Sequence, residues 1–548
     1  MQFYNKEGKV VILKKSIFLF LTVIWAGFFL PPPVIAKSNL STYMDYLKPD
    51  LTKKTNLNQA QDRLIKKQKI TKSKLTVNRY IDNREIGIFL NTNLDDLKKV
   101  YPNNSEFTKT VKYIAGILLT IPWNKLEPEE ANYDFSQIDE AIDWCKLHQK
   151  LLILQIPSSG YSLTTDSQIK SNTPEWFYHS DAKFIEYKNA HNQSCKMPVP
   201  WDDTYLAKWA NFIMAVGKKY DGNHYLHSIS ITGGGYDTNT AILPDNITEL
   251  TRQEIYTKLK TDFKLSQKIA VDNWKYICDL YAKAFPESSL NFGLNPPIPK
   301  RIGEDSLDEI SNYIIFRYGK KIYLTRQNVN SSKNTFDDYR LLLKFHTDTY
   351  TALQLTDSID AEVFRKITKW ALTDGVSIIQ MPYPLLENLT NDTNLNMFKD
   401  FRRRLGFQLV FLKANFPKEI DFDDDITMNF TFDNNGVAPA INYTKELDKQ
   451  IPASYKIEIT FKNKDNQTKA ISYHTPKPPT NSWKSDTPIT WSEDLKTTGI
   501  ARGSYSLFLS LVDKETDQKL NLLDYHQVLP NAQPEIKNSL FIGKIIIK

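Results

Sequence analysis

The sequence predicts a (β/α)8 barrel followed by an all-β, immunoglobulin-like sandwich. Two observations predict this fold. Between residues 84 and 415, short apolar segments alternate with amphipathic helices, and the segments number eight. From residue 420 to 548, apolar and polar residues alternate with a period of two. Short apolar strands separated by helices favour parallel pairing with both faces covered. Eight such units favour closure into a barrel.

The predicted barrel strands are apolar runs bounded by turn residues. In chain order they span residues 85–91, 115–123, 151–157, 227–233, 289–297, 321–329, 351–357 and 376–384. The predicted helices between and after them show apolar residues at helical spacing. They span residues 135–149, 205–220, 262–285, 305–318, 336–347, 361–374 and 396–405. The order of these segments is that of a single continuous barrel.

The last part of the chain has a different pattern of apolar and polar residues. It contains the segments NFTFDNNGVAPA, SYKIEITFKN, GSYSLFLSLVD and FIGKIIIK, with turn residues between them. Alternation with a period of two indicates half-buried antiparallel strands, and several such strands at short intervals favour a sandwich. We therefore predict a β-sandwich domain over residues 420–548.

The N-terminus predicts export. Lys14 and Lys15 precede an apolar run from Ile17 to Leu30, and three prolines and a small-residue site ending at Ala36 follow. This order is typical of a signal peptide, here residues 1–36. The run is shorter than the roughly 20 residues that span a bilayer. We expect a periplasmic, cell-surface or extracellular protein, with membrane contact only if the segment is an uncleaved anchor. Residues 37–80 read as a polar linker.

Charge and motifs argue against several classes of function. The chain carries 70 basic and 63 acidic residues, and its lysines are scattered, which predicts no nucleic-acid partner. Cys145, Cys195 and Cys278 lack metal-site spacing, and nothing in their spacing demands a disulfide. The glycines at 233–235 lack the spacing of a dinucleotide or phosphate loop. We expect no cofactor and no metal.

A barrel's active site lies at the carboxyl ends of its strands, where this sequence gathers aromatic and amide residues. Aromatic rings stack on sugar C–H faces and amides bind hydroxyls, so these residues predict a carbohydrate ligand. The predicted binding residues are Trp123, Asn124, Tyr161, Trp176, Trp201, Tyr236, Asn295, Arg326, Gln354, Gln380 and Tyr383. For Gln354 and Gln380, packing as polar residues inside the barrel is an equal alternative. We expect the glycines at 233–235 to let the backbone approach the ligand closely.

Residues 123–156, WNKLEPEEANYDFSQIDEAIDWCKLHQKLLILQI, resemble the second βαβ unit of many barrel glycoside hydrolases. The matching pattern is W-x-x-L-E-P-x-x-G-x-Y-D-F-x-x-I-D, with Ala131 in place of the glycine. TPEWF (173–177) and residues 201–222 are similar to the same superfamily. The C-terminal segment looks like the sandwich appended to uncharacterised bacterial barrels of this β-galactosidase-like type. Because Glu127 lies in a turn that leads to a helix, we interpret it as structural.

This resemblance also implies where catalytic carboxylates belong. In the retaining clan A enzymes, the acid/base follows the fourth strand and the nucleophile ends the seventh, about 5 Å apart. Here those places read GGGYDTNT and LQLTDS, without a glutamate. Asp237 and Asp357 are the nearest carboxylates and are the predicted catalytic pair. Alternatively, Asp237 is a turn residue and Asp357 caps the next helix.

Three functions remain open at this point. The first is an exported glycoside hydrolase that acts on a poly- or oligosaccharide. The second is a catalytically inactive barrel that binds glycans in the same groove, which the missing glutamates favour. The third is a surface structural or assembly protein that uses the sandwich for partner contacts. Fold alone does not decide among them.

Overall fold

The computed structural model describes residues 86–548 apart from 102–104, 164–168, 296–299, 331–335, 442–454, 514–517, 521–522 and 525–537. The chain divides into two compact units, Met1–Asn78 and Arg79–Lys548, and all described residues lie in the second. The predicted signal peptide (1–36) and linker (37–80) lie outside the described residues. Within the described part, no helix is both long enough and apolar enough to cross a membrane.

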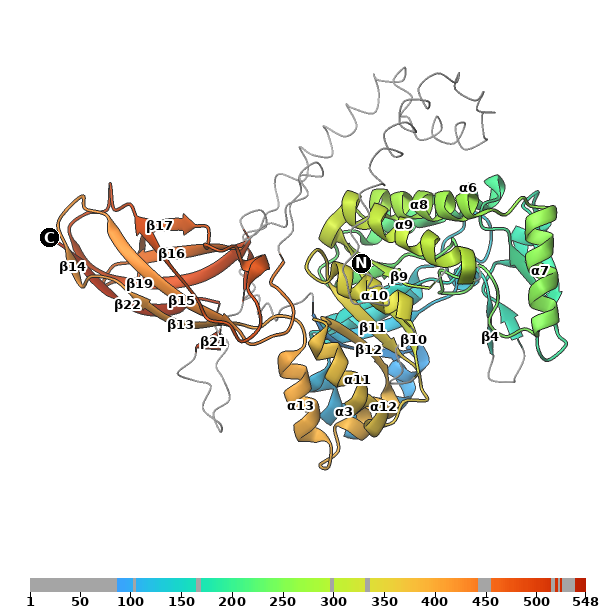
Figure 1. Cartoon of the computed structure of the whole chain (residues 1–548), viewed down its shortest axis with the longest axis horizontal. Coiled ribbons are helices and arrows are strands. Elements are labelled where there is room, and N and C mark those ends of the chain that lie inside the picture. Colours follow the sequence, from blue (N-terminus) through green and yellow to red (C-terminus); the bar gives the residue numbers. More distant parts are fainter. Residues whose placement is uncertain are drawn as a thin grey trace, which may run out of the picture. The chain divides into compact units, whose positions relative to one another are not determined.

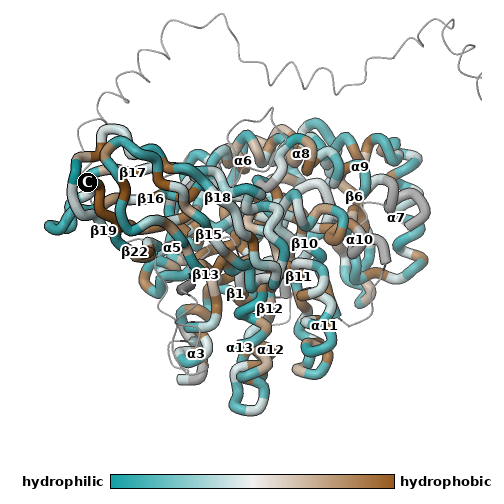
Figure 2. Tube along the Cα trace, turned by 60° about the vertical axis from the view of Figure 1, so that its left-hand side comes forward, coloured by the Kyte–Doolittle hydropathy of each residue, from teal (hydrophilic) through white to brown (hydrophobic). Residues whose placement is uncertain are grey.

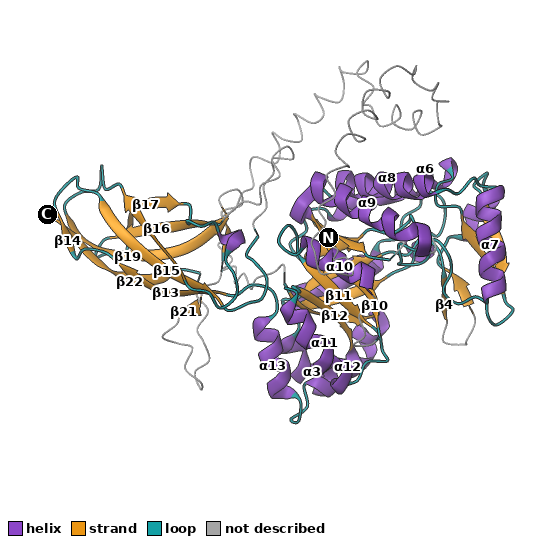
Figure 3. Cartoon of the chain, in the orientation of Figure 1, coloured by secondary structure: helices purple, strands orange, loops and turns teal. Residues whose placement is uncertain are grey.

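Eight parallel strands close into a barrel, and all eight are predicted ones (Figures 1 and 3). In barrel order they are β1 (Gly87–Thr92), β2 (Gly116–Thr120), β3 (Leu151–Gln155), β8 (Leu226–Ser230), β9 (Ser289–Gly293), β10 (Ile322–Val329), β11 (Thr351–Leu355) and β12 (Ile378–Pro382). Each strand pairs in parallel with its neighbour, and β12 returns to pair with β1. The predicted (β/α)8 barrel is confirmed.

Amphipathic helices follow the strands, as the apolar spacing predicts. The main ones are α5 (Ser136–His148), α6 (Asp203–Tyr220), α8 (Gln267–Ala284), α9 (Lys300–Tyr318), α10 (Phe336–Phe345), α11 (Ala361–Thr373), α12 (Tyr383–Leu389) and α13 (Leu395–Arg404). Hydrophobic and hydrophilic stretches alternate along α11 (Figure 2). Helix starts carry side-chain caps: Asp202 accepts from the Tyr205 amide and Asp360 from the Val363 amide.

The inside of the barrel is layered. An apolar layer of inward side chains belongs to one buried cluster and consists of Phe89, Leu118, Ile153, Tyr323, Ala352 and Ile378. Side chains alternate along a strand, so the next inward position is two residues nearer the carboxyl end. In these six strands those positions are all polar: Asn91, Thr120, Gln155, Thr325, Gln354 and Gln380. We call these six residues the polar layer. It lies directly below the mouth.

Two long connections build a small module that the sequence did not predict. One connection, from β3 to α6, forms the hairpins β4–β5 (Tyr161–Leu163, Ile169–Ser171) and β6–β7 (Phe184–Lys188, Ser194–Pro198). The other, after β8, forms α7 (Glu249–Thr261). Their apolar residues share a separate buried cluster that includes Ile185, Met197 and Leu259. The module therefore has its own core, built from loops at the carboxyl ends of β3 and β8.

The C-terminal part forms two sheets, as expected for the predicted β domain (Figure 3). One has the order β18-β15-β13-β21 and the other β14-β22-β19-β16-β17. The longer strands are β13 (Leu409–Asn415), β15 (Ile426–Asn434), β16 (Lys456–Lys462), β17 (Thr468–His474), β18 (Ile489–Leu495), β19 (Gly503–Asp513) and β22 (Leu540–Ile547). The short ones are β14 (Glu419–Ile420), β20 (Gln518–Lys519), which pairs with β19, and β21 (Leu523–Asp524). Because β13 pairs with β15, the β domain begins before the boundary expected at 415–420.

The β domain meets the barrel at the amino ends of the strands. Tyr350, which immediately precedes β11, donates a hydrogen bond from its hydroxyl to the Ile441 carbonyl (2.9 Å). The backbone amide of Gly406 donates to the Val376 carbonyl, just before β12. In barrels the amino ends serve stability and the carboxyl ends carry function. These contacts lie at the end of the barrel opposite the mouth.

Candidate carbohydrate site at the barrel mouth

The glycine loop after β8 is shaped by the protein's own tryptophans. Gly233 has a φ of +94°, and a Cβ there would lie 2.1 Å from the Trp209 Nε1. A Cβ on Gly234 would lie 2.8 Å from the Trp274 ring, and one on Gly235 would lie 2.3 Å from the Asn239 carbonyl oxygen. The space beside these glycines is therefore filled by α6, α8 and the loop itself. Packing within the protein is thus one reason for glycine at these positions, and the close approach of a ligand to this backbone stays a prediction.

Asp237 lies between the loops that follow β3 and β8. Its φ is +55°, its amide donates to the Ser159 hydroxyl (3.1 Å), and its Oδ1 accepts from Asn172 Nδ2 (3.3 Å). Burial raises the pKa of this carboxyl to about 6, and the nearby Asp245 charge acts in the same direction. The left-handed backbone fits the predicted turn role. The raised pKa also suits a proton donor.

Asp357 occupies an exposed turn after β11. The interpretation of Asp357 as a helix cap is wrong, because Asp360 caps α11: its Oδ1 accepts from the Val363 amide (2.8 Å). Asp357 is therefore available at the rim of the strand end where the resemblance places a nucleophile.

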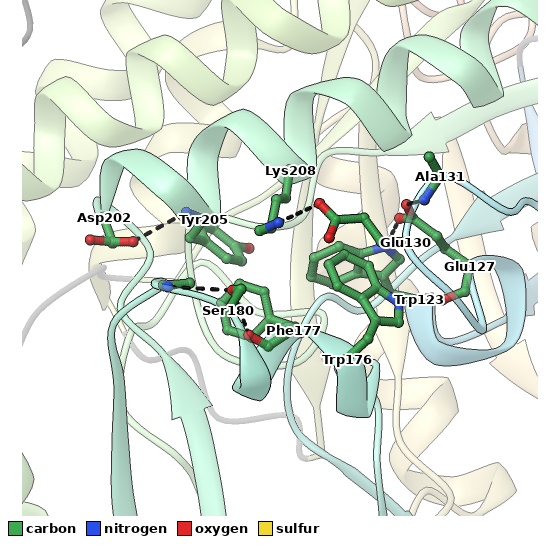
Figure 4. A network of polar contacts seen from close by, with 11 residues as sticks. Trp123, Glu127, Glu130, Ala131, Trp176, Phe177, Ser180, Asp202, Tyr205 and Lys208 are labelled. Atoms are coloured by element: carbon green, nitrogen blue, oxygen red, sulfur yellow. Dashed lines mark hydrogen bonds and ion pairs between the residues drawn. The ribbon is translucent and has the colours of Figure 1, made fainter.

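Glu127 is buried in a hydrogen-bonded network (Figure 4). It ends the short helix α4 (Trp123–Leu126), and its Oε2 accepts from Trp123 Nε1 (2.7 Å) while its Oε1 accepts from the Ala131 amide (2.8 Å). Its carbonyl accepts from Trp176 Nε1 (2.9 Å). Burial raises the pKa of the carboxyl. Ala131 has a φ of +60°, which explains why related motifs carry glycine there.

Several predicted binding residues pack against protein instead. Trp123 is fully buried, 5.1 Å from Trp209 between ring centroids, so its predicted stacking on a sugar is wrong. Arg326 points outward from β10, with its guanidinium 5.9 Å from the Trp370 ring of α11, which corrects its placement at the mouth. Trp123 begins α4, after the end of β2, and its ring packs against Trp209 of α6. Arg326 lies within β10, where alternation decides its direction. Residues near a strand end alternate between the barrel interior and the helices, and helix side chains cover the outward ones.

The aromatic residues of the inserted module form its wall. Tyr161, Trp201 and Tyr236 are partly buried and pack against the module's core. The Tyr236 hydroxyl lies 2.8 Å from that of Tyr187, and Trp201 Nε1 donates to the Phe263 carbonyl (2.8 Å). These rings therefore hold the module together.

Trp176, Asn124 and Tyr383 stay partly exposed near the strand ends. The Lys208 ammonium lies 5.3 Å from the Trp176 ring, and Asn124 Nδ2 donates to the Ser171 carbonyl. Tyr383 begins α12, directly after β12, and its hydroxyl donates to Glu387. These three remain candidates for ligand contact.

An amide network joins the β8 loop to the ends of β9 and β10. Asn239 Oδ1 accepts from Asn295 Nδ2 (3.0 Å) and from Asn328 Nδ2 (3.2 Å). Asn239 Nδ2 donates to Asp245 Oδ2 (3.1 Å), and Asn295 Nδ2 also donates to Gln327 Oε1 (2.9 Å). Of these residues the sequence analysis identified only Asn295. Asn239 and Gln327 could have been found as amides that follow neighbouring strands.

Gln354 and Gln380 both belong to the polar layer, so they point into the barrel. Gln380 is 1% exposed and Gln354 is partly exposed. The three cysteines are buried free thiols. Within the described part of the chain, no group of three His, Cys, Asp or Glu side chains is arranged to hold a metal ion.

Residues 105–280 match the Glyco_hydro_42 family model, described as beta-galactosidase. The protein has a glycoside hydrolase-like barrel. Solved structures similar to this glycosidase-like barrel include the catalytic domain of β-amylase from Paenibacillus polymyxa (10% identity, 57% of this chain, 97% of that chain, TM-score 0.40). Another is xylanase 10B from Thermotoga petrophila (12% identity, 55% of this chain, 83% of that chain, TM-score 0.33). A third is a β-galactosidase from Halorubrum lacusprofundi (11% identity, 62% of this chain, 61% of that chain, TM-score 0.37). No curated protein matches the sequence.

The family match and the barrel support a glycosidase-like function. At the two places where the resemblance implies catalytic glutamates, this glycosidase-like barrel has other residues. β8 is followed by Ile231, Thr232 and Gly233, and the Thr232 hydroxyl lies 3.0 Å from that of Tyr281. β11 contributes Gln354 to the interior. Asp237 and Asp357 come later, in the loops beyond these strand ends.

Proposed function

We propose that this protein is exported and that it binds a poly- or oligosaccharide at the barrel mouth. The polar layer carries the proposal. Amide and hydroxyl side chains occupy all six of its positions, with partly exposed Asn91 and Gln354 among them. Amides both donate to and accept from sugar hydroxyls. The predicted signal peptide supports export, which N-terminal sequencing of the mature protein tests.

Glycan binding is supported over hydrolysis by the residues at the strand ends. A glycosidase needs two carboxyl groups on either side of the scissile bond. Here the ends of β8 and β11 present a threonine, a glycine and an amide. Such a mouth retains hydrogen bonding to hydroxyls without the usual acid and nucleophile. We therefore propose glycan binding ahead of glycoside hydrolysis.

A glycan array followed by calorimetry tests the proposal. We expect saturable binding of at least one glycan, and Gln354→Ala should weaken it about 5- to 10-fold, because one hydrogen bond contributes about 1 kcal/mol. Gln253→Ala is the control, since Gln253 is exposed on α7. Absence of saturable binding to any glycan, or equal affinity in both variants, would contradict the proposal.

Hydrolysis with Asp237 as general acid and Asp357 as the second carboxylate is the second candidate. It is favoured by the Asp237 pKa of about 6, which keeps this carboxyl protonated in mildly acidic solution. Release of reducing sugar should fall as pH rises through about 6, since the acid must be protonated. Asp237→Asn and Asp357→Asn should each reduce the rate by roughly 100-fold or more. Asp392→Asn, at an exposed position, is the control. Activity that survives both substitutions would exclude this pair.

A further inference from the structure

Gln380 is a buried amide without a partner inside the barrel. It is 1% exposed, and neither its Oε1 nor its Nε2 has a hydrogen-bond partner among the described residues. The Oδ1 of Asn91, on the adjacent strand β1, is also buried without one. Gln380 pairs in register with Phe89, and Asn91 is the next inward residue on that strand. Buried polar atoms without hydrogen-bond partners thus lie close together where β12 pairs with β1.

On β2, β3, β8, β9 and β10, inward polar residues satisfy one another. The Thr120 hydroxyl donates to Gln155 Oε1 (3.1 Å) across β2 and β3. Asn291 Nδ2 donates to the Ser230 hydroxyl (3.2 Å), and the Thr325 hydroxyl donates to Asn291 Oδ1. The unpaired buried groups of Gln380 and Asn91 therefore differ from the inward polar groups of those five strands, which are paired.

An unpaired buried amide destabilises a fold, because it loses its bonds to water without replacement. An apolar side chain of similar size would avoid this loss above Phe89 and Ile378, which are both apolar. Native buried polar groups are nearly always paired, so an unpaired one calls for an explanation such as a ligand. The neighbouring inward residues Asn91 and Gln354 are partly exposed, so the layer is open to the mouth on either side of Gln380.

The charges around Gln380 and Asn91 indicate the charge class of the ligand. The six residues of the polar layer are amides and threonines, without a carboxylate or a cation. Arg326, the charged residue on β10, faces α11 and not the interior. An amide with both groups open matches a hydroxyl, which donates and accepts. An anionic ligand would lose its hydration without gaining a counter-charge.

We propose that Gln380 and Asn91 form the innermost part of the binding site and hold hydroxyls of a neutral sugar. This inference rests on the proposed glycan-binding function and specifies where the ligand binds and which charge class it has. Gln380 is then a specificity residue that the fold keeps at a cost to its own stability.

Gln380→Met and Gln155→Met in the full chain form a matched pair, because both amides lie in the polar layer and only Gln155 is paired. We expect Gln380→Met to raise the melting temperature by about 1–3 °C and to weaken binding of a neutral oligosaccharide at least 10-fold. Gln155→Met should lower the melting temperature. A lower melting temperature for Gln380→Met would show that Gln380 has a partner within the protein and would overturn the proposal.

The binding measurements separate the two proposals. Wild-type affinity for a neutral oligosaccharide should exceed that for its uronic acid counterpart at least 10-fold. If the wild type binds neutral glycans and Gln380→Met binds them equally well, the Gln380 site is wrong while the glycan-binding function stands. Equal affinity for neutral and uronate glycans overturns the neutral-ligand assignment. If the wild type binds neither, the proposed function fails and this inference fails with it.

Discussion

Gly233→Ala is expected to lower the free energy of unfolding by about 3–5 kcal/mol, because it combines backbone strain with overpacking. The φ of +94° is costly for any residue with a Cβ. The added Cβ would also lie 2.1 Å from the buried Trp209 ring, which cannot move without disturbing Trp123 beside it. Urea unfolding followed by tryptophan fluorescence measures the change.

Gly499→Ala separates the two causes. Gly499 also has a positive φ, +85°, but a Cβ there would meet nothing within 4 Å. Its substitution should cost only the backbone strain, roughly 1–2 kcal/mol. Equal losses in both variants would mean that Trp209 does not constrain the glycine loop.

Glu127→Ala is expected to destabilise the protein by about 2–4 kcal/mol, because a hydrogen bond to a charged group is lost and a buried donor is left unsatisfied. Its loss leaves Trp123 Nε1 and the Ala131 amide without their acceptor. Glu127→Gln should cost about 1–2 kcal/mol, because the amide oxygen still accepts one of these bonds. Chemical unfolding of both variants measures the difference.

Glu130→Ala is the control for this network. Glu130 forms an ion pair with Lys208 at the surface, and such pairs contribute less than about 1 kcal/mol. If Glu127→Ala keeps its stability and instead loses glycan turnover, Glu127 is a catalytic residue and its structural role is wrong. The pKa of Glu127 is raised mainly by burial, and the nearby Glu130 charge acts in the same direction, so this variant also tests the carboxyl as a proton donor.

The barrel could be predicted because each strand carries its own signal. In LLILQ (151–155) the first four residues are apolar, and the segment lies between amphipathic helices, which suits a strand covered on both sides. The inserted hairpins carried no such signal. β4 and β5 are three residues long, and their stability comes from a cluster shared with α7, far along the chain.

The candidate site was only partly predictable, for a related reason. A tryptophan near a strand end gives the same sequence pattern whether its ring stacks on a sugar or packs against another aromatic side chain. Trp123 meets Trp176 and Trp209, which come from later segments. The same ambiguity applies to the glycines, since a missing Cβ admits a ligand or an indole equally well. Arg326 was predicted to face the barrel mouth, but it lies at an outward position of β10, one residue along from the inward Thr325.

The sequence by itself determined the order of strands and helices, the positions of the strand ends and the absence of glutamates there. Those properties follow from local periodicity and residue type. Only the tertiary structure decided that Gln155 is paired and Gln380 is not, although both are inward amides at equivalent heights. A hydrogen bond needs a partner from a neighbouring strand at the right distance and angle. That condition depends on barrel closure, which brings β12 beside β1 from opposite ends of the barrel sequence.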